Sequence, residues 1–506
     1  MFRRHPANYN CSFSLMSINS GGAGTSTSYF STLTDRQWVM IIREDPSRRK
    51  MKRPFTLFGI SSLRERRPNI LLNGLRPLSG EDGSLHIALF NGNPAEEGFI
   101  TTYDLSPVNQ VLKRRSGHFP TPAQDFGRPF VGIGCYARDS GNCLFLDESR
   151  KLALAFDGVI FNRKELISAI GADPRLPDGL IALELYRNSY GPESGIRRIL
   201  EMIKGSYSLL ILDGTSIAAI RDPSGLRPLL WGMTREDLLF ASESSSFVAL
   251  SSSLIREVGA GEGLLTEGLE ISSIRVADGE GKKCVMELLA LARPESMIHG
   301  RPVYEFRKLL GTLLARAEPR KIDIAVPLPP SGTIPALAYS SYLRIPLEEA
   351  LRPCGQGAAF PFLANPHVLE GKRVALITVY LRSGNFLRKT TEILRGNGAR
   401  EVHIRIASPP LITYCPLSGT GEGNDYIASR AGLREITEQT GADSVVYLSL
   451  RNLKRALGRE WRSFCLGCLD GHFPSLFPSE LLPAGILRSR PPVLREIEER
   501  DLFGDI

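Results

Sequence analysis

Four cysteines in the second half of the chain have the residue type and spacing of a metal-binding set: Cys284, Cys415, Cys465 and Cys468. The last two form a C-x-x-C pair, whereas the other two are far away in the sequence. A fold that brings all four together would place four thiolates around one centre, which suits a [4Fe–4S] cluster or a structural zinc ion. Four buried thiols that bind no metal are the alternative.

The composition is that of an ordinary globular protein. The chain has 506 residues, of which 42% are hydrophobic and 23% charged, enough for two or more domains. Its net charge is +8, but the basic residues are scattered, so we expect no nucleic-acid partner. No apolar run is long enough to cross a membrane. Eight cysteines are too few for a disulfide scaffold, so we expect a cytoplasmic protein in a reducing compartment.

The elements that must position these residues change along the chain. Residues 1–50 include a Ser/Gly/Thr-rich stretch and predict a flexible extension, or else Met51 is the true start. From residue 54 to about 280, short strands separated by turns and helices predict an α+β domain with antiparallel sheets. After 280, a helix over 303–317 and alternating strands and helices predict an α/β domain with a parallel sheet.

Several motifs make the chain resemble the glutamine amidophosphoribosyltransferase family. The motifs occupy residues 155–158, 204–209, 221–229, 240–244, 292–296, 300–305, 326–332, 405–410 and 441–444. The resemblance implies an N-terminal-nucleophile (Ntn) hydrolase-like αββα sandwich, the glutaminase domain, over 51–283. A type I phosphoribosyltransferase-like α/β domain over 284–474 and a tail over 475–506 follow. The family makes phosphoribosylamine from glutamine and phosphoribosyl pyrophosphate (PRPP), the first step of purine synthesis.

The residues at the family's glutaminase positions are the wrong types for that reaction. Phe55 stands where the N-terminal cysteine nucleophile should be, and a phenyl ring has no lone pair. Cys135 replaces the arginine that clamps the substrate carboxylate. The oxyanion Asn-Gly becomes Asp157-Gly158, and a carboxylate repels a developing oxyanion. Asp178 matches the acid that holds the substrate amine, but we expect it to cap a helix N-terminus instead.

Cys135 and Cys143 are the cysteines within this domain, but neither has a histidine nearby in the sequence that would activate it. A reactive thiol needs a neighbouring base or cation. We therefore expect both to be small buried side chains rather than replacement nucleophiles.

The PRPP positions are depleted as well. Thr378 and Val379 stand where the family has two acids for the ribose hydroxyls, which makes a bound Mg²⁺ doubtful. Gly384 of the phosphate loop is retained, as are Ser331 and Gly332 of the pyrophosphate turn. That turn has lost its acid, because proline now precedes Ser331.

The cysteines depart from this trend, because cluster-bearing members of the family place four cysteines as this chain does. The resemblance therefore implies a [4Fe–4S] cluster on Cys284, Cys415, Cys465 and Cys468. Together these features predict an iron–sulfur protein that has lost both half-reactions and acts as a regulatory or scaffolding protein. We expect it to form oligomers with itself or with a catalytic family member. A working, ammonia-fed transferase and a redox or oxygen sensor are the alternatives.

Overall fold

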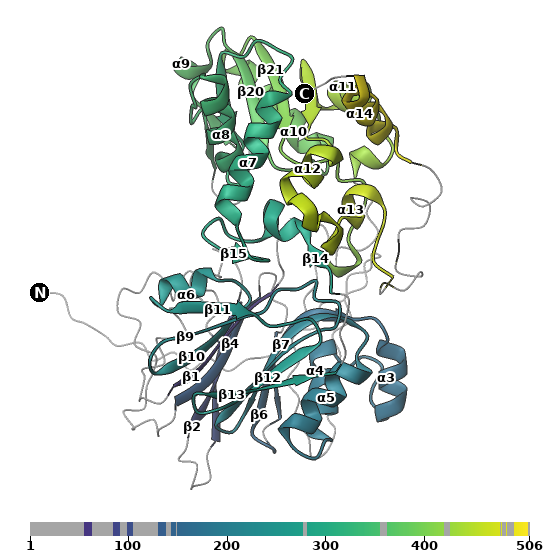
Figure 1. Ribbon diagram of the computed structural model, residues 1–506. Coiled ribbons are helices and arrows are strands. Elements are labelled where there is room, and N and C mark those ends of the chain that lie inside the picture. The colour runs from purple at the N-terminus through teal and green to yellow at the C-terminus, as the bar shows by residue number, and fades with distance from the viewer. Residues whose placement is uncertain are drawn as a thin grey trace, which may run out of the picture. The chain divides into compact units, whose positions relative to one another are not determined.

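The computed structural model describes residues 55–62, 84–91, 99–104, 130–137, 143–147, 149–276, 281–354, 362–418, 426–475, 477, 482 and 490–503 (Figure 1). The chain divides into two units, residues 1–41 and 42–506, and every described residue belongs to the second. The predicted extension over 1–50 and the alternative start at Met51 lie outside the described residues. The predicted domain boundaries stay predictions.

The first half of the described chain forms two antiparallel sheets. The first sheet has the spatial order β11 (Ser253–Glu257), β9 (Leu230–Met233), β10 (Asp237–Ala241), β1 (Phe55–Ser62), β4 (Phe130–Ala137), β2 (Ser84–Asn91) and β3 (Phe99–Asp104). The second has the order β13 (Glu270–Arg275), β12 (Glu262–Glu267), β8 (Ser216–Arg221), β7 (Gly205–Asp213), β6 (Leu152–Ile160) and β5 (Leu144–Asp147). Both sheets carry short strands, as the sequence predicts.

Side chains that alternate along β7 separate two layers of core. Leu210 and Leu212 pack against Leu57 and Ile133 of the first sheet, and so fill the space between the sheets. Leu209 and its partners on that face pack instead against α3 (Arg163–Ile170), α4 (Asp178–Arg187) and α5 (Pro192–Met202). Successive strand residues point to opposite faces, so one apolar strand serves both layers.

The second half contains a parallel sheet. Its strands are, in spatial order, β17 (Ile324–Pro327), β20 (Arg373–Thr378), β21 (Glu401–Ile406) and β22 (Ser444–Tyr447). Its helices include α7 (Val303–Arg316), α8 (Thr333–Leu343), α10 (Gly384–Gly396), α11 (Leu433–Thr440) and α12 (Leu450–Leu457). Along β20, Val374 and Leu376 belong to one apolar cluster, and Ala375 and Ile377 to another. The strand is apolar throughout because both of its faces are covered.

Shorter elements complete the second half. They are β14 (Lys283–Cys284), β15 (Met297–Ile298), β16 (Arg301–Pro302), β18 (Leu351–Pro353), β19 (Phe362–Ala364), β23 (Phe464–Cys465), α9 (Pro366–Leu369), α13 (Gly467–Asp470) and α14 (Pro492–Phe503). A further short helix, α6 (Ser245–Ala249), belongs to the first half. The predicted two-domain class, an antiparallel double-sheet domain followed by a parallel-sheet domain, is confirmed. No helix within the described ranges is long and apolar enough to cross a membrane.

A buried ion pair fixes β21 against the segment that follows α7. Arg405 is fully buried, and its guanidinium donates to both carboxylate oxygens of Glu318, with Nη2 2.6 Å from Oε1. The hydroxyl of Tyr339 donates to the same carboxylate, and Ser444 Oγ accepts from Arg405 Nη1 at 3.0 Å. Burial raises the pKa of Glu318, but the hydrogen bonds from Arg405 outweigh it and hold that pKa below its usual value.

Replacing Glu318 by Ala should lower the free energy of unfolding by about 3–5 kcal/mol, because Arg405 would be left buried without its counter-charge. Urea denaturation measures this loss. The matched control is Glu438→Ala, which removes the pair between Arg434 and Glu438, whose side chains are 94% and 64% exposed. That exposed pair should contribute no more than about 1 kcal/mol. Equal losses in the two variants would contradict the assignment of the buried pair as the stabilising one.

Candidate functional site

The structure brings the segments that carry the four cysteines together. Strands β14 and β23 pair in parallel and place Cys284 opposite Cys465. Cys468 follows in α13, and its carbonyl accepts a 3.0 Å hydrogen bond from the amide of Ile412, in the segment that leads to Cys415. The convergence predicted for these distant segments is therefore present.

The four thiols also share one electrostatic environment. Burial raises the pKa of Cys284 and of Cys468 well above the usual range, and negative charge on the neighbouring cysteines raises both further. Burial likewise raises the pKa of Cys465 to about 12. The hydrogen bond from the Gly467 amide lowers this pKa, whereas negative charge on Cys415 raises it. A bound metal would have to displace the protons of these thiols.

The four cysteines suit a four-thiolate centre in residue type, and the segments that carry them lie next to one another. Their side chains are not arranged as a metal site, however, because no three His, Cys, Asp or Glu side chains among the described residues could hold a metal ion. Among the described free cysteines, Cys354 lies outside this set.

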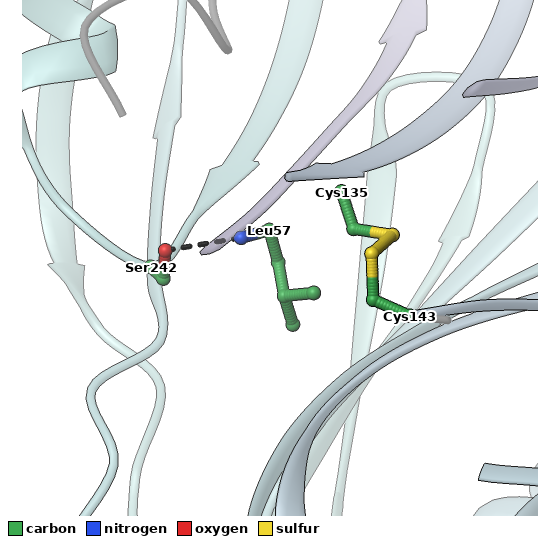
Figure 2. Close-up of a disulfide and its surroundings, with 4 residues drawn as sticks. All are labelled: Leu57, Cys135, Cys143 and Ser242. Carbon is green, nitrogen blue, oxygen red and sulfur yellow. Dashed lines mark hydrogen bonds between the residues drawn. A yellow bond between two sulfur atoms is a disulfide. The ribbon is translucent and has the colours of Figure 1, made fainter. Parts of the chain in front are cut away.

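Phe55, which the resemblance places at the nucleophile position, starts β1. Phe55 is the first residue of the strand, and its Cα lies opposite Ala137 of β4. Two residues later, the Leu57 amide donates a 3.1 Å hydrogen bond to Ser242 Oγ (Figure 2). The head of the strand is thus held from both neighbouring strands, because Phe58 also lies opposite Ala241 of β10.

Cys135 and Cys143 form a disulfide, which the sequence-based prediction of two separate thiols did not include. Both cysteines are fully buried, as predicted, and their Cα atoms are 6.2 Å apart (Figure 2). Cys135 lies opposite Leu57 in the first sheet, whereas Cys143 directly precedes β5 of the second sheet. Packing of the two sheets brings the sulfurs together, and a periodicity along one strand does not reveal such a contact. Cys135, which the resemblance places at the clamp position, is therefore part of a neutral cross-link.

Asp157, which the resemblance places at the oxyanion position, forms an ion pair with Arg227. Nη1 of Arg227 lies 2.5 Å from Oδ1 of Asp157, and both side chains are buried. Nη2 of Arg227 donates to the carbonyl of Leu417 at 3.0 Å. The pair neutralises the acid. Gly158 is required by packing, because a Cβ there would lie 2.4 Å from Cβ of Tyr207.

A loop braced by Arg221 holds Arg227 in place. The guanidinium of Arg221 donates to the carbonyls of Arg227, Val258 and Gly225 and to the carboxylate of Glu257. Gly225 adopts a φ of 63°, which favours glycine at this turn. The motif over residues 221–229 was recognised in the sequence, but the pairing of its second arginine with Asp157 was not. The sequence signal for that pairing was that the motifs over residues 155–158 and 221–229 carry side chains of opposite charge.

Asp178 is the first residue of α4, and Pro177 occupies the cap position, so the predicted N-cap role of Asp178 is wrong. Its carboxylate accepts from the amide of Ile160 at 2.8 Å and pairs with Arg163 at 2.8 Å. The acid thus ties the end of β6 to α3 and α4. This cross-connection reflects tertiary packing, which the local cap signal does not contain.

The residues at the PRPP positions lie at the carboxyl end of β20. Thr378 ends the strand and Val379 follows; both are buried, and Thr378 Oγ1 donates to the carbonyl of Tyr380 at 3.3 Å. Open α/β sheets bind ligands at this edge. Here the two positions offer a hydroxyl already in use and an isopropyl group, and no carboxylate.

The retained small residues have packing roles as well. A Cβ on Gly332 would lie 2.0 Å from the carbonyl oxygen of Ile377, so the turn that contains Ser331 requires glycine there. Gly384 begins α10, and a Cβ on it would lie 3.0 Å from Ile427 Cδ1. Packing therefore explains glycine at position 332, whereas at Gly384 the neighbour is the flexible end of a side chain that can move aside.

Fold and site together define a class: a glutaminase-type double-sheet domain joined to a phosphoribosyltransferase-type α/β domain. A family model described as a glutamine amidotransferase domain matches residues 136–249. The chain is 31% identical over 364 residues to the amidophosphoribosyltransferase of Methanothermobacter thermautotrophicus, which covers 67% of this chain and 77% of the relative. The chain belongs to the amidophosphoribosyltransferase family.

Other relatives and solved structures agree with this assignment. Amidophosphoribosyltransferase 1, chloroplastic, of Arabidopsis thaliana is 32% identical over 54% of this chain, which spans 52% of the plant protein. The glutamine PRPP amidotransferase of Bacillus subtilis, solved with ADP and GMP, superposes with a TM-score of 0.73 at 28% identity, covering 85% of this chain and 99% of the other. A structure described as the allosteric regulatory enzyme of purine biosynthesis gives a TM-score of 0.74 at 27% identity, covering 85% of this chain and 98% of the other.

Removal of the disulfide should weaken the double-sheet half. The bond joins residues separated by 8 positions, and closing a loop of that size stabilises a fold by about 2 kcal/mol. A Cys135→Ala, Cys143→Ala variant should unfold at lower urea concentration than the oxidised protein. Dithiothreitol should lower the urea denaturation midpoint of the parent protein and leave that of the variant unchanged. If dithiothreitol left the denaturation midpoint of the parent protein unchanged, the disulfide would be contradicted.

Proposed function

We propose that this protein is a family member that has lost both half-reactions and acts as a regulatory or scaffolding protein. The observation that carries the proposal is that β1 begins with Phe55. The neighbouring strands β4 and β10 set the register of β1 from both sides. A slip by one residue would turn every side chain of β1 to the opposite face, so the identity of this first residue is well defined. Phenylalanine cannot form an acyl intermediate.

The other substituted positions support the same proposal. The Cys135–Cys143 disulfide offers no cation to a substrate carboxylate, and Asp157 is bound to Arg227. Thr378 and Val379 supply no oxygens of the kind that Mg²⁺ or ribose hydroxyls take from a pair of carboxylates. We therefore infer no role for Mg²⁺.

A protein that keeps the fold without the chemistry can still assemble with others. We propose a homo-oligomer, or a hetero-oligomer with a catalytic family member, in the cytoplasm and without nucleic acid.

A working transferase is the second candidate, and membership of an enzyme family favours it. Ammonia as the nitrogen source would make the missing nucleophile irrelevant, because the glutaminase half serves to release ammonia. The lost acid pair at Thr378 and Val379 weighs against this candidate.

The activity test separates these candidates. The purified protein should release no glutamate from glutamine and form no phosphoribosylamine above a no-protein control, because the nucleophile and the acid pair are missing. The amidotransferase of Bacillus subtilis serves as the positive control. Product from ammonia alone would establish the second candidate. Product from glutamine would refute the proposed loss of function altogether.

We also propose that Cys284, Cys415, Cys465 and Cys468 hold a [4Fe–4S] cluster. The pairing of β14 with β23 and the mutual influence of the thiols support a common centre. When bound, such a cluster supplies cross-links between distant segments and an electron-transfer centre, and the latter keeps a redox or oxygen sensor as an alternative. Zinc would use the same donors.

Anaerobic purification should give a brown protein with about four iron and four sulfide per chain. Cys468→Ser should remove the iron and make the segment around Cys465 sensitive to proteolysis, because the tie to Cys284 would be lost. Cys354→Ser is the matched control and should keep both iron and protease resistance. If the protein contained zinc in place of iron, the site would be a structural zinc site and not a [4Fe–4S] site. A fully stable metal-free protein would refute a metal centre.

A further inference from the structure

A loop of the first half, residues 222–227, is bonded to the segment that leads into β14. The carbonyl of Ser224 in this loop accepts a 2.8 Å hydrogen bond from the backbone amide of Lys282. Lys282 lies two residues before Cys284 in the sequence. The loop therefore contributes to the position at which the chain enters β14.

The same loop is bonded to the segment that carries Cys415. Nη2 of Arg227, at the end of the loop, donates a 3.0 Å hydrogen bond to the carbonyl of Leu417. Leu417 belongs to the 3-10 helix Pro416–Ser418, which directly follows Cys415 in the sequence. Cys284 and Cys415, the two cysteines outside the C-x-x-C pair, thus each lie two residues from a residue that is hydrogen-bonded to this loop.

The loop is held in one conformation by its own contacts. The carboxylate of Asp222 accepts hydrogen bonds from the amides of Ser224 at 2.7 Å and of Gly225 at 3.2 Å. The loop backbone also packs closely against the segment before β14, because a Cβ on Gly225 would lie 2.9 Å from Cβ of Ala260 and 3.5 Å from Cα of Gly281. An ordered loop of this kind can set the position of the segments that are bonded to it.

Arg227 joins Asp157 to Leu417 because a guanidinium presents its donors in a rigid planar fork. Nη1 lies 2.5 Å from Oδ1 of Asp157, while Nη2 reaches the carbonyl of Leu417. The side chains of Arg227 and Asp157 are 9% and 2% exposed, so solvent does little to screen the pair. The carboxylate of Asp157 therefore fixes the direction in which Nη2 points.

Other contacts attach the two halves independently of Arg227. The carboxylate of Glu243 accepts hydrogen bonds from the amide of Arg293 at 2.9 Å and from Ser296 Oγ at 3.0 Å. Loss of the bond from Arg227 should therefore release the Cys415 segment without separating the halves.

We propose that Arg227 is a positioning residue for the Cys415 segment and that Asp157 acts on this segment through Arg227. The acid that the resemblance places at the oxyanion position thus has a structural role in the other half of the chain. The proposal concerns the position of residues 411–418, so it holds with or without a bound metal and with or without catalytic activity.

Hydrogen–deuterium exchange of the full-length protein tests this proposal. Arg227→Lys keeps a positive charge beside Asp157 but removes the fork that also reaches Leu417. The backbone amides over residues 411–418 should then exchange at least about tenfold faster, the equivalent of one lost hydrogen bond to a charged group. Exchange over α7 and β20 should stay at the parental rate, because the effect is local.

The matched control is Arg163→Lys. Nη1 of Arg163 likewise pairs with a carboxylate, that of Asp178, at 2.8 Å, and Nη2 donates to a backbone carbonyl, that of Pro174, at 2.7 Å. All three residues belong to the first half, so this variant should leave exchange over residues 411–418 unchanged.

Parental exchange over residues 411–418 in Arg227→Lys would overturn the proposal. The same acceleration in the control would also overturn it, because the effect would then reflect a general loss of stability. If Arg227→Lys fails to fold, the double variant Asp157→Asn, Arg227→Met decides. It replaces the buried ion pair by neutral side chains of similar size, a change that folds often tolerate, and it removes the bond to Leu417. Faster exchange over residues 411–418 in this variant supports the proposal, and exchange at the parental rate refutes it.

Discussion

The buried guanidinium of Arg221 is the interaction on which the arrangement of the first half depends. It donates hydrogen bonds to three backbone carbonyls and to the carboxylate of Glu257. Glu257 in turn accepts from the backbone amide of His299, in the hairpin of β15 and β16. Burial raises the pKa of Glu257, but His299 and Arg221 outweigh it and lower that pKa to about 2. One charge-compensated arginine thereby fixes the loop that carries Arg227.

The fold was predictable from the sequence because its signals are local. The apolar stripe of α7 and the continuous apolar run of β20 identify a helix and a buried parallel strand without any knowledge of their neighbours. The helix predicted over 303–317 ends at Arg316. The family resemblance also predicted that four cysteines converge; the structure pairs two of them, Cys284 and Cys465, and the four-cysteine site stays a prediction.

The contacts that the sequence did not reveal join residues on different sheets or loops. Asp157 and Arg227 are 70 positions apart, and each has an ordinary local environment. Cys135 and Cys143 are close in sequence, yet their bond depends on the stacking of two sheets, which no strand pattern encodes. Asp178 followed a local capping rule that a tertiary contact with Ile160 overrides. Local propensity thus gave the elements, and pairing across layers required the structure.

The parallel pairing of β14 with β23 has a consequence for the order of folding. It joins Cys284, at the start of the α/β half, to Cys465, which lies beyond all four strands of the parallel sheet in the sequence. A contact between segments so distant in sequence has a high loop-closure cost, so it forms after the elements between them have assembled. Of the two helices that follow, α14 packs in the same core as β20, so the C-terminal segment completes this half rather than leaving it.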